Sequence, residues 1–450
     1  MCAKSVAIIG GGPSGIAAAK ALSAENAFDR IVIFEQQEQL GGVWNYSKRK
    51  PGAALVPSDS PARTREWNRN QSTYFSAMYE KLETNIVKDL MPYNNYPFPK
   101  ASDTLPPRQD VLKYLLSYAK GLDPSVTVHL NTVVTHLEKV GTEWRIGYRQ
   151  SSQVEREDTY QYIIIASGHY NFPYIPNVPG LEKWAEVDAD SISHSMYYIN
   201  NEKFRGSKVL VIGNAISGVD ISLQLTEVTW PVYRSKRHEP LLKPVEIEDI
   251  IEVSEIIKYD VSTRSVTTID GKIIDGIDHI LFCTGYLYDF PFLKTYMSGE
   301  DAIITDGRIT RRLYRQIFYI PDPTLSFSGV VKNVVPFPLA ESQAAVIARV
   351  FSGRLSLPNE AKMRESELAD VKERGSENKF HVYEAPADVE YINTLQQWVD
   401  RAEPTELGFK AEVWTEEKKQ RRVDCINVKN AHHLKYYAHI KTLRDKTRKD

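Results

Sequence analysis

The feature that most constrains the fold of this 450-residue chain is a strand, glycine-rich turn and helix pattern that occurs twice. The turns lie at 10–15 and 213–218, about 200 residues apart. Each turn follows a β-branched run, opens an apolar helical stretch and is followed by a further strand, as at the opening of a doubly wound parallel sheet. The sequence therefore predicts an α/β protein with two Rossmann-like dinucleotide-binding domains.

The first turn fits the pattern G-x-G-x-x-G and contains Gly10, Gly12, Pro13, Ser14 and Gly15. The first glycine makes the tight turn, the second lets the backbone approach a pyrophosphate, and the third permits close packing of helix on strand. The helix N-terminus attracts the phosphate charge. Glu35 ends the next strand, where a carboxylate can accept hydrogen bonds from ribose hydroxyls.

A second glycine cluster follows shortly after Glu35. It consists of Gly41, Gly42, Val43 and Trp44. This G-G-x-W stretch resembles the second cluster of FAD enzymes, where the backbone passes close to the flavin side of the cofactor. We therefore expect FAD at the first site.

The second turn has alanine in place of the middle glycine. Its members are Gly213, Asn214, Ala215, Ser217 and Gly218. The strand after it ends in Arg234 and Ser235, followed by Lys236 and Arg237, with no acid like Glu35. Because arginine suits a 2′-phosphate where an acid would bind a 2′-hydroxyl, the second site is expected to bind NADPH. Arg234 is the expected phosphate ligand, and Lys236 or Arg237 could share the role. Two different dinucleotides indicate a hydride relay from nicotinamide to flavin.

Composition excludes several other classes of protein. The formal net charge of −2 gives no field for nucleic acid. The three cysteines have neither metal spacing nor the CxxxxC of disulfide reductases, so we expect no metal site and a cytoplasmic protein with reduced thiols. No apolar run is long enough for a membrane anchor. Nucleophile–base motifs and paired carboxylates are also missing from the sequence.

Hydrophobic periodicity predicts further elements between and after the two turns. Residues 47–73 show no period and are predicted to be a long surface excursion. The chain after Asn359 is mostly charged and helix-like. Strands are expected at 5–9, 31–34, 126–130, 144–148, 162–166, 209–212, 232–234 and 280–283, and helices at 15–25, 109–121, 216–225 and 341–351.

With these residues in view, the chain resembles the flavin-containing monooxygenases, and among them the fungal, yeast-type members. The resemblance runs from about Val6 to Met363. Residues 79–85 resemble the family's L-x-T-N segment, 164–170 its A-T-G-H-Y strand and 282–286 its C-T-G-Y linker. Pro336, Phe337, Pro338 and Gln343, with Leu357, Pro358 and Met363, resemble its C-terminal flavin-side region.

One stretch departs from the family pattern F-x-G-x-x-x-H-x-x-x-[Y/F/W]. Asp188 stands for the phenylalanine and Asp190 for the glycine, whereas His194 and Tyr198 match. The departure lies in the connection that leads to the second turn. It implies a looser coupling of NADP to the flavin, with more release of hydrogen peroxide.

The resemblance implies a mechanism and a set of partners. NADPH reduces FAD, O2 adds to give a flavin C4a-hydroperoxide, and a small nucleophilic substrate, an amine, thiol or sulfide, takes the distal oxygen while NADP+ stays bound. Asn85 is the catalytic candidate, because its amide is implied to lie near the reactive flavin edge. Thr284, Gly285 and Gln343 are implied cofactor contacts. The family also suggests a homodimer.

The expected architecture is a discontinuous FAD-binding domain, 1–170 and 288–450, with an NADPH-binding domain, 171–287, inserted into it. Ala166 to Gly168 and Thr284 to Gly285 are the expected crossings. Three alternatives remain open at this point. The chain could be a reductase that passes electrons to a protein or quinone, a Baeyer–Villiger or N-hydroxylating monooxygenase, or a flavoprotein scaffold or redox sensor.

Overall fold

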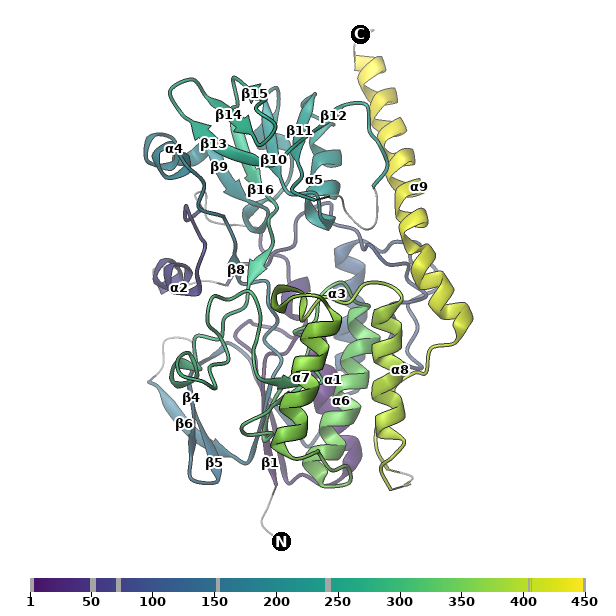
Figure 1. Cartoon of the computed structure of the whole chain (residues 1–450). Helices are drawn as coiled ribbons and strands as arrows, with labels where there is room; N and C mark the ends of the chain where they lie inside the picture. The colour runs from purple at the N-terminus through teal and green to yellow at the C-terminus, as the bar shows by residue number, and fades with distance from the viewer. Residues whose placement is uncertain are drawn as a thin grey trace. The chain divides into compact units, whose positions relative to one another are not determined.

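A computed structural model describes residues 4–48, 54–69, 74–150, 154–238, 244–403, 405 and 407–447 (Figure 1). The chain divides into two compact units, and each is built from three stretches of sequence. Unit 1 comprises 1–45, 86–169 and 288–423, and unit 2 comprises 46–85, 170–287 and 424–450. The chain therefore passes between the units five times.

The main sheet of unit 1 has seven strands in the order β18-β19-β20-β7-β1-β2-β3. The five strands from β20 to β3 are parallel, and β1 lies in the centre between β2 and β7. Buried β-branched side chains fill the central strands, as expected for a parallel sheet covered on both faces. The bounds are β1 Ser5–Ile9, β2 Arg30–Phe34, β3 Val126–His129, β7 Tyr162–Ile165, β18 Leu313–Tyr314, β19 Phe318–Tyr319 and β20 Leu325–Phe327.

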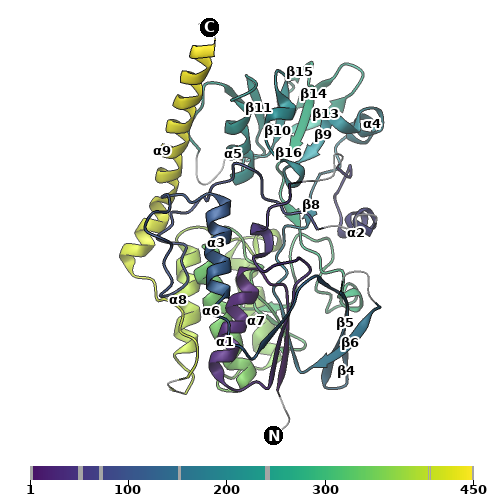
Figure 2. The same cartoon turned by 180° about the vertical axis from the view of Figure 1, so that it is seen from behind.

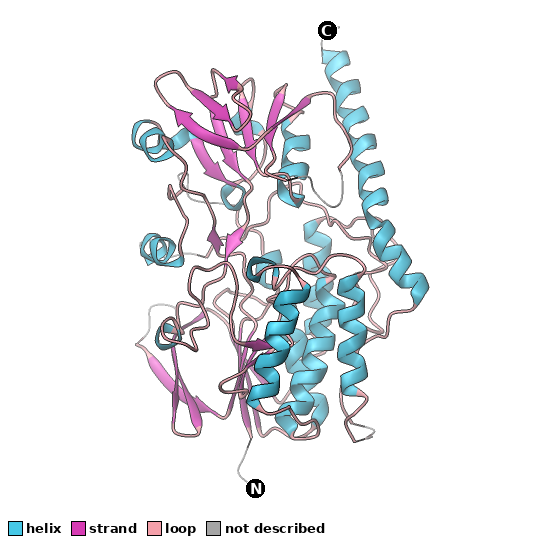
Figure 3. Ribbon diagram, viewed as in Figure 1, coloured by secondary structure: helices cyan, strands magenta, loops and turns pink. Residues whose placement is uncertain are grey.

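Helices and a small antiparallel sheet complete unit 1 (Figures 2 and 3). The helices are α1 Pro13–Glu25, α3 Arg108–Ala119, α6 Pro336–Ser352, α7 Glu360–Glu373 and α8 Ala387–Val399. The antiparallel sheet consists of β4 Thr132–Val140, β5 Glu143–Gln150 and β6 Arg156–Tyr160. Helix α6 packs against α1 and α8.

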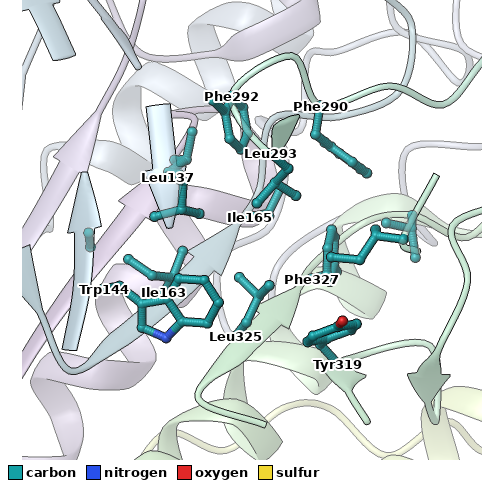
Figure 4. Close-up of a cluster of buried hydrophobic side chains, with 14 of the residues drawn as sticks. Leu137, Trp144, Ile163, Ile165, Phe290, Phe292, Leu293, Tyr319, Leu325 and Phe327 are labelled. Carbon is teal, nitrogen blue, oxygen red and sulfur yellow. The ribbon is translucent and has the colours of Figure 1, made fainter. Parts of the chain in front are cut away.

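A cluster of buried aromatic and aliphatic side chains lies in the core of unit 1 (Figure 4). Ile163 and Ile165 of β7 and Phe327 of β20 meet Trp144 of β5 and Phe290 there. The antiparallel sheet and the chain after residue 288 therefore cover one face of the main sheet, which fixes the ends of β1, β2 and β7.

Unit 2 contains a five-stranded parallel sheet in the order β12-β11-β10-β16-β9. Its strands are β9 Ile192–His194, β10 Val209–Ile212, β11 Val232–Ser235, β12 Ile250–Val253 and β16 His279–Phe282. A smaller antiparallel sheet has β13 Ile256–Asp260, β14 Ser265–Thr268 and β15 Ile273–Ile274, and β8 Phe172–Pro173 pairs with β17 Tyr286–Leu287. The helices of this unit are α2 Pro61–Arg69, α4 Leu181–Val187 and α5 Ile216–Leu225.

Helix α9, Glu416–Thr447, is the longest helix described, and its residues from Asp424 onward belong to unit 2. Nowhere in the described chain is there a helix both long enough and apolar enough to cross a membrane.

The predicted strands and helices all occur, with ends that move by a few residues. The largest change is α6, which begins five residues before the predicted 341. The predicted excursion 47–73 instead contains helix α2, while 49–53 and 70–73 lie outside the described residues. The expected domain pieces differ from the units at two stretches, because 46–85 and 424–450 belong to unit 2.

Candidate functional site

The first glycine turn follows β1 directly and is shaped by two close backbone approaches. Gly10 has φ +109°, and its N–H donates to the carbonyl of Phe34 at 2.8 Å. A Cβ added to Gly10 would lie 2.5 Å from the carbonyl oxygen of Ala166, and a Cβ at Gly15 would overlap the carbonyl oxygen of Gly10. Glycine is therefore required at both positions.

The turn delivers the chain into α1 in a form that fits a phosphate group. Gly12, the residue before the helix, is extended with φ −76° and has no side chain to cap it. Pro13 takes the first helical position, where its missing N–H costs nothing, and Ser14 follows. The N–H groups of the first helical turn and the positive end of the helix dipole suit a pyrophosphate.

The second glycine cluster packs backbone to backbone against this turn. The N–H of Gly41, with φ +124°, donates to the carbonyl of Gly11 at 2.9 Å. A Cβ on Gly42, which has φ +57°, would lie 2.8 Å from the Cα of Gly12. Val43 and Trp44 continue in the short helix η1, Gly42–Trp44, and the buried Trp44 meets the Phe337 ring edge-on, with 6.2 Å between centroids. The structure thus brings the two predicted clusters together.

Glu35 lies beside the same turn. One carboxylate oxygen accepts the N–H of Gly11 at 2.7 Å, and the other accepts the N–H of Gln37 at 2.8 Å. Burial raises the pKa of the carboxyl, and these backbone hydrogen bonds oppose the rise. Each oxygen retains a lone pair, so Glu35 can fix the turn and still accept from a ribose hydroxyl.

A polar cluster around α6 was missed by the sequence reasoning. Glu341 is buried, and its carboxyl oxygens accept the hydroxyl of Tyr118 at 2.9 Å and the N–H of Asn94 at 2.7 Å. Burial raises its pKa to about 8. Next to Asn94, the Tyr93 hydroxyl donates to the carbonyl of Pro13 at 2.9 Å, at the start of α1. The sequence signal that could have pointed to this cluster is Glu341 itself, the single acid in the largely apolar helix α6.

Gln343 of the same helix is buried. Its side-chain oxygen accepts the N–H of Gly329 at 2.9 Å, just beyond the end of β20, and its amide nitrogen donates to the Tyr391 hydroxyl at 3.2 Å. Gln343 therefore fixes a loop at the carboxyl end of the parallel strands, the edge at which α/β sheets bind ligands.

The second glycine turn repeats the geometry of the first. Gly213 has φ +114°, and a Cβ there would lie 2.6 Å from the carbonyl oxygen of Cys283. A Cβ on Gly218 would overlap the carbonyl oxygen of Gly213. Ala215 has φ −79°, close to the −76° of Gly12, and Ser217 lies in the first turn of α5. The side chain of Asn214 donates to the carbonyl of His238 at 3.0 Å.

Equivalent hydrogen bonds align the strands that follow the two turns. The N–H of Gly213 donates to Ser235, as the N–H of Gly10 does to Phe34. The N–H of Lys236 then donates to a neighbouring strand, as the N–H of Glu35 does. Lys236, rather than Arg234, therefore occupies the position equivalent to Glu35.

Arg234 is buried, with 4% exposure, and its guanidinium donates to Glu252 of β12 at 2.7 Å. Lys236 lies 2.9 Å from the other oxygen of the same carboxylate. The Ser235 hydroxyl donates to the carbonyl of Ser254 at 3.0 Å. Arg234 and Lys236 thus share the carboxylate of Glu252.

The return crossing is held by a histidine of the family pattern. Gly285 has φ +82°, and its carbonyl accepts from Nε2 of the buried His194 at 3.1 Å. Nδ1 of His194 accepts the N–H of Met196 at 3.0 Å, so the proton is on Nε2, and burial lowers the pKa to about 3. The Thr284 hydroxyl donates to the carbonyl of Tyr174. His194 and Thr284 thus act structurally within unit 2.

Asp188 and Asp190, which replace the phenylalanine and the glycine of the family pattern, have hydrogen-bond partners of their own. Asp188 accepts from Arg264 at 2.8 Å, an interaction that lowers the pKa of its carboxyl, while the carbonyl of Asp190 accepts from Lys203. Tyr198 is buried against Tyr79, with ring centroids 5.5 Å apart. Burial raises the pKa of the Cys283 thiol to about 12, so this cysteine is a packing residue.

Asn85 is the last residue of the first stretch of unit 2 and is half-buried. Within the described part of the chain, its side-chain amide makes no hydrogen bond. The preceding residues, in contrast, are tightly held. An amide with free donors and a free acceptor is suited to a ligand.

Comparison with known proteins shows the family of this chain. The profile of the family described as Flavin-binding monooxygenase-like matches residues 64–242 and 243–405, and that of an NAD(P)-binding Rossmann-like domain matches 8–82. This chain is a member of the flavin-containing monooxygenase family. Its cofactors are therefore FAD and NADPH, and the two uncapped helix N-termini in their glycine turns fit their pyrophosphates.

Individual relatives agree with this assignment over the full chain. The thiol-specific monooxygenase of Saccharomyces cerevisiae is 32% identical over 454 residues, which cover 98% of this chain and 96% of the relative. Flavin-containing monooxygenase ustF2 of Aspergillus flavus is 28% identical over 88% of this chain and 91% of its own length. The structure of S-allyl-L-cysteine S-oxygenase from Allium sativum has a TM-score of 0.80 at 24% identity and covers 99% of this chain and 98% of its own, which shows a shared fold. The monooxygenase assignment removes the reductase and scaffold readings.

Proposed function

We propose that this monooxygenase uses NADPH and O2 to oxygenate a soft nucleophile, the nitrogen or sulfur of a small molecule, with thiols as the leading class. The observation that carries the proposal is the unpartnered amide of Asn85, in the described residues, at the end of a tightly held segment. The thiol class is favoured because the yeast relative with 32% identity is named a thiol-specific monooxygenase.

FAD, once reduced by NADPH, supplies the activation of O2. The part of unit 1 is to hold this cofactor. The helix α1 N-terminus would take the pyrophosphate, the carboxylate of Glu35 would accept from the ribose, and Gly42, Val43 and Trp44 would line the flavin side. Gln343 fixes the loop at Gly329.

The part of unit 2 is to bind NADPH and to retain NADP+. The N-terminus of α5 would take the pyrophosphate between Gly213 and Gly218, and Lys236 would pair with the 2′-phosphate. The ammonium of Lys236 already lies beside Glu252, so the phosphate competes with that carboxylate for it.

Asn85 would donate a hydrogen bond to the reacting oxygen or to the bound nicotinamide. An amide is suited to this role because it does not titrate and offers donors as well as an acceptor. A preorganised donor that is held before the reaction stabilises developing charge without reorganisation cost. A soft nucleophile needs no base from the protein, which agrees with His169 and His194, two of the buried histidines, whose pKa values burial lowers to about 3.

Substrate class is tested by measuring NADPH oxidation and hydrogen peroxide together, with thiols, sulfides, tertiary amines and a cyclic ketone as candidate substrates. We expect a thiol to raise NADPH oxidation and to lower the peroxide released per NADPH. Turnover of the ketone alone would identify a Baeyer–Villiger enzyme. NADPH oxidation that yields only peroxide with every compound would contradict the proposal.

The role of Asn85 is tested with Asn85→Leu. Loss of one preorganised donor costs about 2.7–4 kcal/mol where charge develops, so oxygenation should fall on the order of a hundredfold while FAD content is retained. Peroxide per NADPH should rise toward one. Asn393→Leu is the control, because Asn393 is a half-buried asparagine on α8 whose amide donates to the carbonyl of Trp414 at 2.9 Å and does not contact the 79–85 segment. Full coupling in Asn85→Leu would remove Asn85 from the site.

A further inference from the structure

A buried carboxylate joins three separate stretches of unit 2. Asp220 lies on α5, and its carboxyl accepts from the hydroxyl of Tyr79 and from the Gln224 amide at 3.0 Å. From α9, Nζ of Lys429 lies 4.0 Å and Nε2 of His433 lies 3.6 Å from its second oxygen. Asp220 is therefore the meeting point of α5, α9 and the segment 79–85.

The charge on Asp220 is stabilised by these neighbours. Burial alone raises the pKa of the carboxyl, but the interactions with His433, Lys429 and Tyr79 outweigh it and lower the pKa. Lys429 is itself buried, with 4% exposure. A buried ammonium costs several kcal/mol unless it is paired and hydrogen-bonded, so its place opposite Asp220 is a requirement of the packing.

Lys429 also reaches the backbone beside Asn85. Its ammonium donates to the carbonyl of Thr84 at 3.2 Å. Helix α9 also contacts Glu83, the residue before Thr84. A carboxylate oxygen of Glu83 lies 2.6 Å from Nε2 of His432. Helix α9 thus holds both residues that precede the unpartnered amide.

The segment has a second attachment to α5. Lys81 lies 2.5 Å from the carboxylate of Glu227, just beyond the end of α5, and the hydroxyl of Tyr436 on α9 donates to the same carboxylate. Figures 1 and 2 show α9 running beside α5 in this unit. The helix whose N-terminus forms the second glycine turn therefore shares its anchors with the segment that ends at Asn85.

We propose that Lys429 is a positioning residue for Asn85: by joining the carbonyl of Thr84 to Asp220 of α5, it fixes the amide relative to the NADPH-binding helix. Helix α9, whose charged sequence shows no chemistry of its own, is on this account part of the oxygenation machinery. The importance of Asn85 rests on the proposed function, whereas the attachment rests on the contacts alone.

The test uses the full-length protein with FAD and NADP+ bound and compares Lys429→Met with Lys441→Met. Lys441 lies on the same helix, but it is exposed, and its ion-pair partner is Glu248, at 2.6 Å, rather than Asp220. Hydrogen exchange of the peptide that spans 79–87 should rise about tenfold or more in Lys429→Met and stay unchanged in Lys441→Met. Lys429→Arg, which keeps the charge and the donors, should restore much of the protection.

The oxygenation readout separates this inference from the proposed function. In Lys429→Met we expect peroxide per NADPH to rise as in Asn85→Leu, at unchanged FAD content. If Lys429→Met folds poorly, Asp220→Asn tests the same attachment, because it removes the charge and keeps the shape. Unchanged exchange at 79–87 in these variants would overturn the positioning role, even if Asn85→Leu uncouples the enzyme. Raised exchange with full coupling in both Lys429→Met and Asn85→Leu would support the attachment and refute the role of Asn85.

Discussion

The two glycine turns have the same backbone geometry and different surroundings. Gly10 and Gly213 have φ values of +109° and +114°, and Gly12 and Ala215 are extended in the same way. Gly12 is buried under Gly42, whereas Ala215 is exposed. The backbone shape is thus set by local sequence, while the cover is set by a second glycine cluster that only the first turn has. A covered turn suits a cofactor that stays bound, and an open turn suits one that exchanges.

The largest effect should come from a methyl group placed where neither turn has room. In Gly15→Ala, the new Cβ overlaps the Gly10 carbonyl, overpacking that typically costs about 1–3 kcal/mol, and we expect the purified protein to lack FAD. Gly218→Ala should keep FAD and weaken NADPH. Flavin absorbance and NADPH titration measure the two losses.

The matched variant is Gly12→Ala, which copies the second turn into the first. Its Cβ would lie 3.4 Å from the Cα of Gly42, an ordinary contact, so most of the FAD should be retained. Equal loss of FAD in Gly12→Ala and Gly15→Ala would show that the two turns are not equivalent.

One buried acid in each unit, Glu341 and Asp220, should contribute to stability with opposite dependences on pH. Burial raises the pKa of Glu341 in unit 1 to about 8, against about 4.3 unfolded. Its contribution to stability is complete below the unfolded pKa and is lost as pH rises toward 8, by an amount of the order of a few kcal/mol. Between about pH 5 and 8, the melting temperature of Glu341→Gln should therefore change less with pH than that of the unmutated protein.

Asp220 of unit 2 provides the contrast, because its pKa is lowered in the folded protein. Its contribution to stability is present above the unfolded pKa of about 3.9 and is lost as pH falls. The melting temperature of Asp220→Asn should approach that of the unmutated protein only in acid. Parallel pH profiles for the Glu341 and Asp220 variants would refute this difference between the units.

Lys236, which occupies the position equivalent to Glu35, should select NADPH over NADH. In Lys236→Ala, loss of a charge-assisted contact with the 2′-phosphate, about 1.5–3 kcal/mol, should weaken NADPH tenfold to a hundredfold and leave NADH nearly unchanged. Arg234→Ala should mainly lower the stability of unit 2, since it leaves Glu252 with one partner fewer. A selective loss of NADPH in Arg234→Ala alone would restore the interpretation made from sequence.

The smallest effect is expected at the altered family pattern. Asp188 and Arg264 are both about one-third exposed, and such a pair contributes about 0.2–1 kcal/mol. Asp188→Asn should therefore shift the melting temperature by no more than about 2–4 °C. A shift several times larger would show that this ion pair replaces the missing phenylalanine as a structural anchor.

Sequence predicted both turns well because their requirements are local. It placed the phosphate contact first at Arg234 because the strand was expected to end there, whereas β11 extends to Ser235. Arg234 therefore lies inside the strand and is buried, whereas Lys236 follows its last residue. Glu341 and Asp220 could not be found in this way, since their partners lie far away in the chain, as Asn94 and Lys429 do.

The threading of the chain has a consequence for biosynthesis. Unit 1 needs residues up to 423 and unit 2 needs α9, so neither can be completed until nearly the whole chain has left the ribosome. Until those residues emerge, each unit lacks part of its packing. Gene fragments cut at 170 and 287, where the sequence suggests domain borders, would encode two incomplete cores, so neither cofactor-binding half can be produced by simple excision.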